Sequence, residues 1–388
     1  MRSVSPPPGD EARAVSDTLL EKIVQAIAHH DGCLPFDSYM TMALYEPGLG
    51  YYSNGLLPFG EQGDFVTAPE SGSLFSRCLA RAIASVLQQV DNGCVLELGA
   101  GSGALARVLL QELEALDAVP ERYCILERSA GMRSLQEQAL AGVPHLAGRV
   151  AWLDAPPQQP FNGVVFGNEV ADALPVRLFR WDGGEVVLPG VGRQGGRLGW
   201  CAQPADDETA DRVRQLARDG GWQGVYESEY CPGLKAWVKG LAACIAQGAL
   251  LLVDYGYGRA EYYHAQRSMG TLLCHYRHQA HDDALWCPGL QDITAFVDFT
   301  SIAEAATDAG MRFSGYTSQA QFLAGCGIDA LLAEIDPADH RRFLPLSNEA
   351  KRLMLPGEMG ERFKVIGFSR DIERDMIGFA LRDLRSRL

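Results

Sequence analysis

The chain has 388 residues, of which 47% are hydrophobic and 21% charged, and its formal net charge at pH 7 is −15. This composition is ordinary for a globular protein with a full core, and the length suggests one large domain or two modest ones. An acidic surface repels nucleic acid phosphates and anionic lipid, so we expect neither as a partner, whereas a basic protein or peptide would be attracted. The alternative, which charge alone favours, is that the acidic surface only keeps the protein soluble.

The cysteine pattern and the N-terminus bear on the compartment. Ten cysteines are scattered without a Cys-x-x-Cys pair, so neither zinc nor a redox dithiol is indicated. Several of them lie in apolar runs, where cysteine acts as a small hydrophobic residue, and this pattern favours a reducing compartment. The N-terminus has no apolar signal core, its early acids argue against a mitochondrial presequence, and no apolar run is long enough to cross a bilayer. These features predict a cytoplasmic protein without membrane insertion.

Residues 1–92 are predicted to form a helical segment that covers a cofactor. Ser16 or Asp17 can cap a helix with an apolar face formed by Leu19, Leu20, Ile23, Val24 and Ile27. A segment rich in glycine and tyrosine follows at 39–63. The apolar spacing from Leu74 to Val86 predicts a second amphipathic helix that leads into the first strand of a sheet.

From residue 93 onward, strands and helices alternate, which predicts a parallel sheet covered on both faces. The candidate strands are 93–97, 123–127, 149–153, 163–167, 249–254, 311–316 and 363–369. Helices are expected at 301–309 and 320–335. The predicted fold class is α/β, a doubly wound, seven-stranded, Rossmann-like sheet built from 93–174 and 249–388.

The interval 175–248 is too long for a simple crossover, and we predict that it is an inserted, substrate-facing lobe. It holds a hairpin signal around Trp181-Asp182-Gly183-Gly184 and a second glycine-rich turn at 193–199. Two helical stretches follow these turns.

The most informative motif is Glu97-Leu98-Gly99-Ala100-Gly101-Ser102-Gly103, between an apolar run and an amphipathic run. This order predicts strand, glycine turn and helix, in which the backbone presses against a ligand beside a helix N-terminus. A carboxylate at Glu97 would repel the pyrophosphate of a dinucleotide and suit the sulfonium and ammonium groups of S-adenosylmethionine (SAM). Gly99-x-Gly101-x-x-Ala104 also satisfies the dinucleotide fingerprint, so a dinucleotide site and a purely structural turn stay open as alternatives.

Acidic residues follow the next two predicted strands. Glu127 can bind both ribose hydroxyls of a nucleoside, an interaction that serves SAM and NAD equally, or it is a solvated strand-end carboxylate. After the third strand, Leu153 can line an adenine ring and Asp154 can accept its amino group. The alternative for Asp154 is an ordinary acid of a surface loop.

The segment Asn168-Glu169-Val170-Ala171-Asp172-Ala173-Leu174-Pro175 follows the fourth strand, whose end should face the transferable methyl group. Pro175 disfavours a helix at Leu174 and leaves a turn with two acids. Glu169 and Asp172 can converge on one cation, and a guanidinium offers a planar fork that carboxylates match. We predict an acceptor site here; the alternative is an acidic helix cap.

Two later segments are less specific. Asp254-Tyr255-Gly256-Tyr257-Gly258 would border the acceptor pocket, or it is a glycine-rich exit from the fifth strand. His275, His278 and His281 do not match a zinc spacing, so we expect polar loop histidines and no metal site.

Five segments occur in the order typical of one family: 44–52, 63–70, 97–103, 168–175 and 288–294. From about Phe36 to the C-terminus the chain resembles the MidA-like SAM-dependent methyltransferases, whose mitochondrial members assist respiratory complex I assembly. The resemblance implies a class I methyltransferase fold and a segment with Thr67, Pro69 and Glu70 that folds over the cofactor. In the mitochondrial members it implies symmetric dimethylation of an arginine on a complex I subunit. Phe296 stands where this family leads us to expect a histidine, a departure that bears on any proton relay there.

Together these features predict a SAM-dependent methyltransferase that acts on an arginine of a protein partner, with Glu169 and Asp172 in the catalytic role. The predicted cofactor-binding residues are Thr67, Pro69, Glu70, Glu97, Gly99, Ala100, Gly101, Gly103, Glu127, Leu153, Asp154 and Asn168. The alternatives are a SAM-binding assembly chaperone without turnover and an NAD(P)-dependent dehydrogenase.

Overall fold

The computed structural model describes residues 7–56 and 72–388, and the chain divides into two compact units. Unit 1 combines Met1–Phe65, Asp172–Leu234 and Gly258–Asp298; unit 2 combines Val66–Ala171, Lys235–Tyr257 and Phe299–Leu388. Most of the interval 175–248 therefore lies in unit 1, together with N-terminal residues and 258–298, whereas 235–248 lies in unit 2. Each unit is described by itself.

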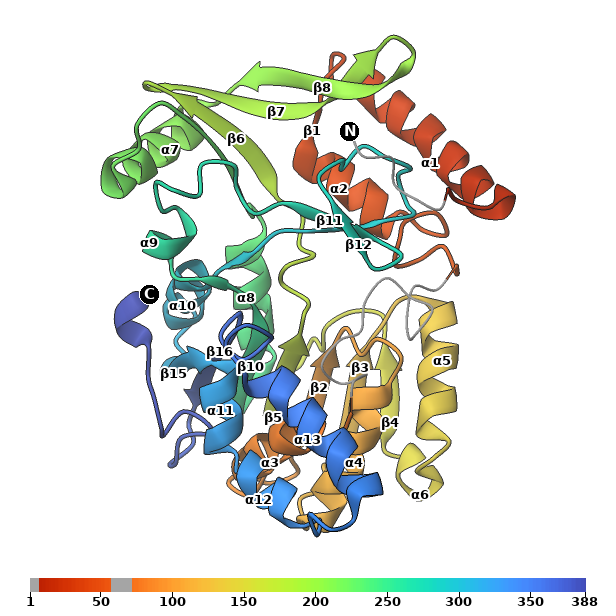
Figure 1. Cartoon of the computed structure of the whole chain (residues 1–388), viewed down its shortest axis with the longest axis vertical. Helices are drawn as coiled ribbons and strands as arrows, with labels where there is room; N and C mark the ends of the chain where they lie inside the picture. The colour runs from red at the N-terminus through yellow and green to blue at the C-terminus, as the bar shows by residue number, and fades with distance from the viewer. Residues whose placement is uncertain (1–6, 57–71) are drawn as a thin grey trace. The chain divides into compact units, whose positions relative to one another are not determined.

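Unit 2 contains a mostly parallel sheet with the strand order β15-β16-β10-β5-β2-β3-β4 (Figure 1). Its strands are β2 (Cys94–Leu98), β3 (Arg122–Leu126), β4 (Val150–Leu153), β5 (Phe161–Asn168), β10 (Ile245–Tyr257), β15 (Arg312–Ser318) and β16 (Phe363–Arg370). β16 runs antiparallel to both β10 and β15, whereas β4, β3, β2, β5 and β10 are parallel neighbours. All seven predicted strands are present. The strand order reverses at β2 and β5, where a doubly wound sheet binds its ligand.

The core of unit 2 forms where two amphipathic helices cover the sheet. Helices α3 (Leu74–Leu87) and α4 (Ala104–Ala115) bury their apolar faces with side chains of β2, β3 and β5, including Val95, Tyr123 and Phe166. Each fully buried side chain of this size contributes about 1.5–3 kcal/mol of hydrophobic free energy. The glycine motif between β2 and α4 is thus attached to two firmly packed elements.

The remaining helices of unit 2 partly match the prediction. They are α5 (Ala130–Leu140), α6 (Pro144–Ala147), α8 (Leu234–Ala243), α10 (Phe299–Asp308), α11 (Gln319–Gly325), α12 (Ile328–Ala333), α13 (His340–Met354) and the 3-10 turn η2 (Arg385–Arg387). The stretch expected at 320–335 is two helices, because Gly327 adopts a φ of +81° and ends the first one. The sequence analysis did not anticipate α13, which carries Pro345 in its interior.

Unit 1 is built from helices and two antiparallel sheets. Its helices are α1 (Asp10–His29), α2 (Phe36–Tyr45), α7 (Asp207–Gly220) and α9 (Arg259–Tyr262). One sheet holds β1 (Leu34–Pro35), β6 (Arg177–Asp182), β7 (Glu185–Gln194), β8 (Arg197–Pro204) and β9 (Val225–Tyr230); the other holds β11 (Leu273–Tyr276), β12 (Gln279–His281) and β13 (Asp292–Thr294). The short strand β14 (Val297–Asp298) is the last element of this unit in chain order.

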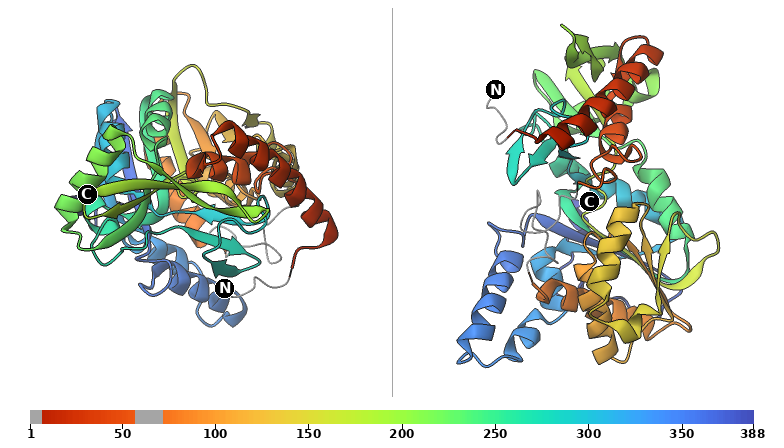
Figure 2. Two further views of the ribbon diagram at one scale, coloured as in Figure 1. Left: turned by 90° about the horizontal axis from the view of Figure 1, so that it is seen from above. Right: turned by 90° about the vertical axis from the view of Figure 1, so that its right-hand side faces the viewer.

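Both predicted turns of unit 1 join strands, β6 to β7 and β7 to β8, and the two helical stretches expected after them are α7 and α8. The prediction of the first helix needs a correction. Helix α1 begins at Asp10 rather than at Ser16 or Asp17, and Ser16 is buried within the helix. Figure 2 shows α1 beside the β7–β8 ribbon. Among the described residues, none of the helices combines the length and the apolarity that a membrane span requires.

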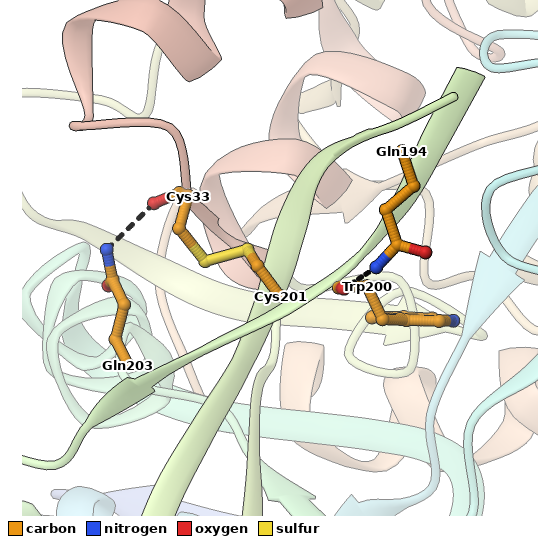
Figure 3. The surroundings of a disulfide bond; sticks show 5 residues. All are labelled: Cys33, Gln194, Trp200, Cys201 and Gln203. Atoms are coloured by element: carbon orange, nitrogen blue, oxygen red, sulfur yellow. Dashed lines mark hydrogen bonds between the residues drawn. A yellow bond between two sulfur atoms is a disulfide. The ribbon is translucent and has the colours of Figure 1, made fainter. Parts of the chain in front are cut away.

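A disulfide joins Cys33, just before β1, to Cys201 on β8 (Figure 3). Their Cα atoms are 5.9 Å apart, and the Gln203 side-chain amide donates a hydrogen bond to the Cys33 carbonyl at 3.0 Å. Gly190 makes room for the bridge, because a Cβ there would lie 3.1 Å from the Cys33 sulfur. This pair therefore departs from the reduced cysteines that the sequence pattern favours, while the other eight cysteines are free.

Candidate active site

The glycine motif forms a tight turn between β2 and α4. Gly99, Gly101 and Gly103 have φ values of +61°, +52° and +84°, a region that favours glycine. A Cβ at Gly99 would lie 2.6 Å from the Val170 side chain, so this glycine also permits close packing against the loop after β5. The predicted order of strand, glycine turn and helix is therefore present, and approach of the motif's backbone to a ligand at the N-terminus of α4 stays a prediction.

Glu97 is placed differently from what the charge argument assumed. Its side chain is 2% exposed and accepts a hydrogen bond from the Tyr123 hydroxyl at 2.7 Å. Burial raises its pKa to about 8, partly offset by that hydrogen bond. The Glu97 carboxyl is thus mostly protonated at neutral pH and would repel a pyrophosphate only weakly. The charge of Glu97 is therefore a weaker reason to prefer SAM over a dinucleotide. Contact between Glu97 and the cationic end of SAM stays a prediction.

The ends of β3 and β4 carry the predicted ribose and adenine residues. Glu127 accepts hydrogen bonds from the Ser129 backbone N–H at 2.8 Å and from the Gln136 side chain at 3.2 Å. Leu153 ends β4 and is half-buried. Asp154 is highly exposed and pairs with Arg133 at 2.6 Å. The parallel register places the ends of these strands beside that of β2.

The loop after β5 has a strained backbone. Glu169 has a φ of +54°, which is uncommon for a residue other than glycine and is typical of functional sites. Its carboxylate accepts from the Asn168 side chain at 3.0 Å and from the Tyr255 hydroxyl at 3.5 Å. The buried Asp254 carboxylate holds this loop, because it accepts from the backbone N–H groups of Val170 and Ala171 at 3.1 and 2.8 Å.

Asp172 belongs to unit 1, where it is 4% exposed. Nearby, Tyr52 donates to Asp292 at 2.9 Å, and the rings of Tyr45 and Tyr52 stack with centroids 5.5 Å apart. Burial of the Tyr45 hydroxyl raises its pKa, and the negative charges of Asp292 and Asp172 raise it further. Because Glu169 belongs to unit 2, the joint action of Glu169 and Asp172 on one cation stays a prediction.

The remaining predicted positions are the cofactor-covering segment, the histidines and Phe296. Thr67, Pro69 and Glu70 lie outside the described residues. His275 and His281 lie on the hairpin of β11 and β12, and burial lowers the pKa of both. In the described part of the chain, no group of three or more histidine, cysteine or acidic side chains could hold a metal ion. The backbone N–H of Phe296 donates to the Thr271 hydroxyl at 2.8 Å.

The sequence analysis missed several residues that hold the site. Gln136 and Arg133 on α5 contact the ends of β2, β3 and β4, Tyr123 binds Glu97, and Asp254 binds the loop after β5. Asp254 was noted as a border of the acceptor pocket, but its backbone contacts were not foreseen. Such contacts leave no periodic signal in a single sequence. Only the strand-end position of Asp254 pointed toward this role.

The reversed strand order at β2 and β5, with a glycine turn there and acids at the neighbouring strand ends, is typical of a nucleoside-binding doubly wound sheet, the class to which class I SAM-dependent methyltransferases belong. A family model for S-adenosyl-L-methionine-dependent methyltransferases matches residues 78–317. The chain therefore belongs to this family, is an enzyme, and uses SAM as its methyl donor. The predicted fold class and family resemblance are confirmed.

Known proteins resemble the chain over most of its length. It is 30% identical over 373 residues to the mitochondrial protein arginine methyltransferase NDUFAF7 of Danio rerio, covering 86% of this chain and 82% of the relative. The human protein of that name is 28% identical over 385 residues, covering 86% and 79%. A Burkholderia thailandensis protein crystallised with S-adenosyl-homocysteine is 44% identical with a TM-score of 0.94, covering 99% of this chain and all of that one.

Proposed function

We propose that this methyltransferase transfers the methyl group of SAM to an arginine side chain of a protein partner. The observation that carries the proposal is the similarity, along most of the chain, to proteins named protein arginine methyltransferases. We propose a partner similar to a respiratory complex I subunit, which is the substrate that the family resemblance implies for the mitochondrial members. A basic segment on that partner would suit the net charge of −15.

The contacts within unit 1 support a planar cation as the acceptor. The Tyr45 side chain is 39% exposed and stacks on Tyr52, and the buried carboxylates of Asp172 and Asp292 lie close enough to affect the Tyr45 hydroxyl. A guanidinium stacks on aromatic rings and forms paired hydrogen bonds with carboxylates. A lysine ammonium lacks this planar fork, so the same groups favour arginine.

The proposed roles in unit 2 follow the strand ends. The loop of Gly99, Ala100, Gly101 and Gly103 would admit the methionine portion of SAM, and Glu127 would bind the ribose. Leu153 and Asp154 would contact the adenine, with Asn168 near the methyl group. Glu169 would align the guanidine for in-line displacement of the sulfonium. Since SAM is an activated donor, positioning can supply up to about 7–11 kcal/mol of the barrier reduction in ideal cases.

The experiment combines the purified chain, methyl-labelled SAM and a cell lysate, and locates the label by mass spectrometry of the modified protein. We expect methylarginine in a protein other than the enzyme. Glu169→Gln is the matched control, since it removes one charge at nearly constant volume; it should keep SAM affinity and reduce labelling at least about 100-fold, or about 2.7 kcal/mol.

Three results would count against the proposal. Label on lysine, on a small molecule or on nucleic acid would overturn the arginine assignment. Tight SAM binding without any labelled product would instead favour an assembly chaperone without turnover. Full labelling by Glu169→Gln would remove Glu169 from the acceptor role.

A further inference from the structure

Helix α5 directs two polar side chains toward the ends of the strands that carry the cofactor residues. Arg133 and Gln136 are three positions apart and therefore lie on one face of the helix. Gln136 is fully buried, whereas Arg133 is partly exposed. In Figure 1, α5 lies beside β3 and β4.

The Gln136 amide makes three hydrogen bonds with three different segments. Its Nε2 donates to the Gly101 carbonyl at 3.0 Å and to Glu127 at 3.2 Å, and its Oε1 accepts from the Trp152 indole N–H at 2.8 Å. Only one orientation of the amide satisfies all three partners. A flipped amide would place its oxygen against two acceptors and its nitrogen against a donor.

Arg133 contacts the residues that follow β3 and β4. Its Nε donates to the Glu127 backbone carbonyl at 2.8 Å, and its Nη2 donates to the Asp154 carboxylate at 2.6 Å. The glycine motif also packs closely on the helix, because a Cβ at Gly103 would lie 2.9 Å from the Gln136 Cα. Thus α5 contacts the loop after β2 and the ends of β3 and β4.

We propose that Arg133 and Gln136 form a positioning clamp that holds the glycine motif, Glu127 and Asp154 in the arrangement that binds SAM. Neither residue needs to touch the cofactor. The clamp acts by preorganisation, because a loop already held in its binding geometry loses less conformational freedom when the ligand arrives. This inference rests on the placement of SAM at these strand ends, which is part of the proposed function.

Chemistry singles out glutamine for the central position. Asparagine is one methylene shorter, and glutamate would offer no proton to Gly101 or Glu127 while adding a second carboxylate beside Glu127. An apolar replacement would leave the Gly101 carbonyl, the Glu127 oxygen and the Trp152 N–H each without this partner.

The test measures the Kd for SAM by calorimetry, together with KM for SAM, kcat and thermal unfolding. Gln136→Met keeps the approximate volume and the helix propensity but makes no hydrogen bonds, and we expect SAM affinity to fall about 10- to 100-fold with kcat at saturating SAM within about threefold. Gln138→Met is the matched control, since it is the same change at an exposed position of the same helix, and it should leave the Kd unchanged.

A second variant provides a readout that a purely structural role would not produce. Gln136→Glu should bind SAM poorly at pH 8 and regain affinity as the pH is lowered, because the protonated carboxyl can again donate a hydrogen bond. Neither the wild type nor Gln136→Met should show this recovery. If Gln136→Met does not fold, Arg133→Met tests the clamp at its exposed edge, with an expected three- to tenfold loss of SAM affinity.

Two outcomes would overturn the clamp. One is a folded Gln136→Met with the SAM affinity of the wild type, and the other is an unchanged Kd in Arg133→Met. A failure of the arginine proposal would look different, because calorimetry with SAM alone involves no methyl acceptor. An absence of SAM binding by the wild type would instead contradict the proposed cofactor contacts.

Discussion

The two units hold their polar groups in different ways. In unit 2, the predicted cofactor residues lie at the ends of neighbouring parallel strands, so regular secondary structure brings them together. In unit 1, the comparable contacts join segments that are far apart in the chain. Tyr52 donates to Asp292 across 240 positions, and the Tyr45 hydroxyl donates to the Ala173 carbonyl across 128 positions.

We relate this difference to the proposed roles of the two units. Under that proposal, unit 2 binds SAM through a local motif on the parallel sheet, and side chains of unit 1 contact the acceptor. Segments held by long-range contacts can change without altering that sheet. The comparison predicts that cofactor binding depends on unit 2 and is insensitive to changes confined to unit 1.

The largest expected effect comes from the same substitution in both units. Gly101 has a φ of +52° in unit 2, and Gly195 has a φ of +57° at the β7–β8 turn of unit 1, where a Cβ would meet open space. Valine at either position costs about 1–3 kcal/mol of backbone strain. We expect Gly101→Val to weaken SAM binding at least about 100-fold and Gly195→Val to leave it unchanged, as measured by calorimetry.

Thermal unfolding of both variants separates strain from loss of the site. Similar losses of stability with only Gly101→Val deficient in SAM binding would support the comparison. Retained affinity in Gly101→Val would show that the glycine motif does not approach the ligand. Equal losses of affinity in both variants would show that the units are not independent in cofactor binding.

The same contrast explains what could be predicted from the sequence. The seven strands, α3, α4 and the glycine turn were predictable because apolar periodicity and glycine are local signals. The start of α1 was predicted at the wrong place. Ser16 and Asp17 are good capping residues, but the helix begins at Asp10. The break at Gly327 was missed, since one glycine within an apolar stretch does not necessarily end a helix.

The candidate site shows the same difference between residues predicted from local signals and residues that depend on tertiary packing. The strand-end positions of Glu127 and Asp154 followed from the order of elements, whereas their partners Gln136 and Arg133 required the packing of α5. Glu97 shows the limit of charge arguments made without burial. The charge argument took Glu97 as an ionised carboxylate, and only the structure reveals Tyr123 beside it and the raised pKa.

A smaller effect is expected from the disulfide of unit 1. Replacing Cys33 and Cys201 together by serine should lower the free energy of unfolding by about 2–4 kcal/mol, because the bridge restricts the unfolded chain. Denaturant unfolding measures this loss, and the Kd for SAM should not change. Cys287→Ser, at a free cysteine of the same unit, is the matched control and should cost less than about 1 kcal/mol.

The state of these cysteines in the cell bears on the expected location. Stable disulfides are rare in a reducing cytoplasm, so the bridge is evidence against the predicted cytoplasmic location. Alkylation of the freshly denatured protein, followed by intact-mass measurement, should give eight adducts before reduction if Cys33 and Cys201 are paired. Ten adducts would show that the bridge is absent in that compartment, and a changed SAM affinity on reduction would break the comparison of the units.

The smallest expected effect concerns the buried Glu97 in unit 2. Because its pKa is raised from 4.5 to about 8 by burial, the folded state holds this proton more tightly than the unfolded state does. The stabilisation is fully present below pH 4.5 and is lost as the pH rises toward 8. Between pH 5.5 and 8 this one group should therefore lower the free energy of unfolding by about 1–3 kcal/mol.

Glu97→Gln tests this linkage, since the amide cannot ionise and its carbonyl can still accept from Tyr123. The variant should lose less stability than the wild type between pH 5.5 and 8 in denaturant unfolding, while Glu137→Gln, at an exposed position of α5, should follow the wild type. Calorimetry with SAM then decides the second role of the residue. A large loss of affinity would place Glu97 at the cationic end of SAM, whereas unchanged affinity would make it a buried structural acid. In that second case the glycine motif would bind SAM through its backbone without this carboxylate.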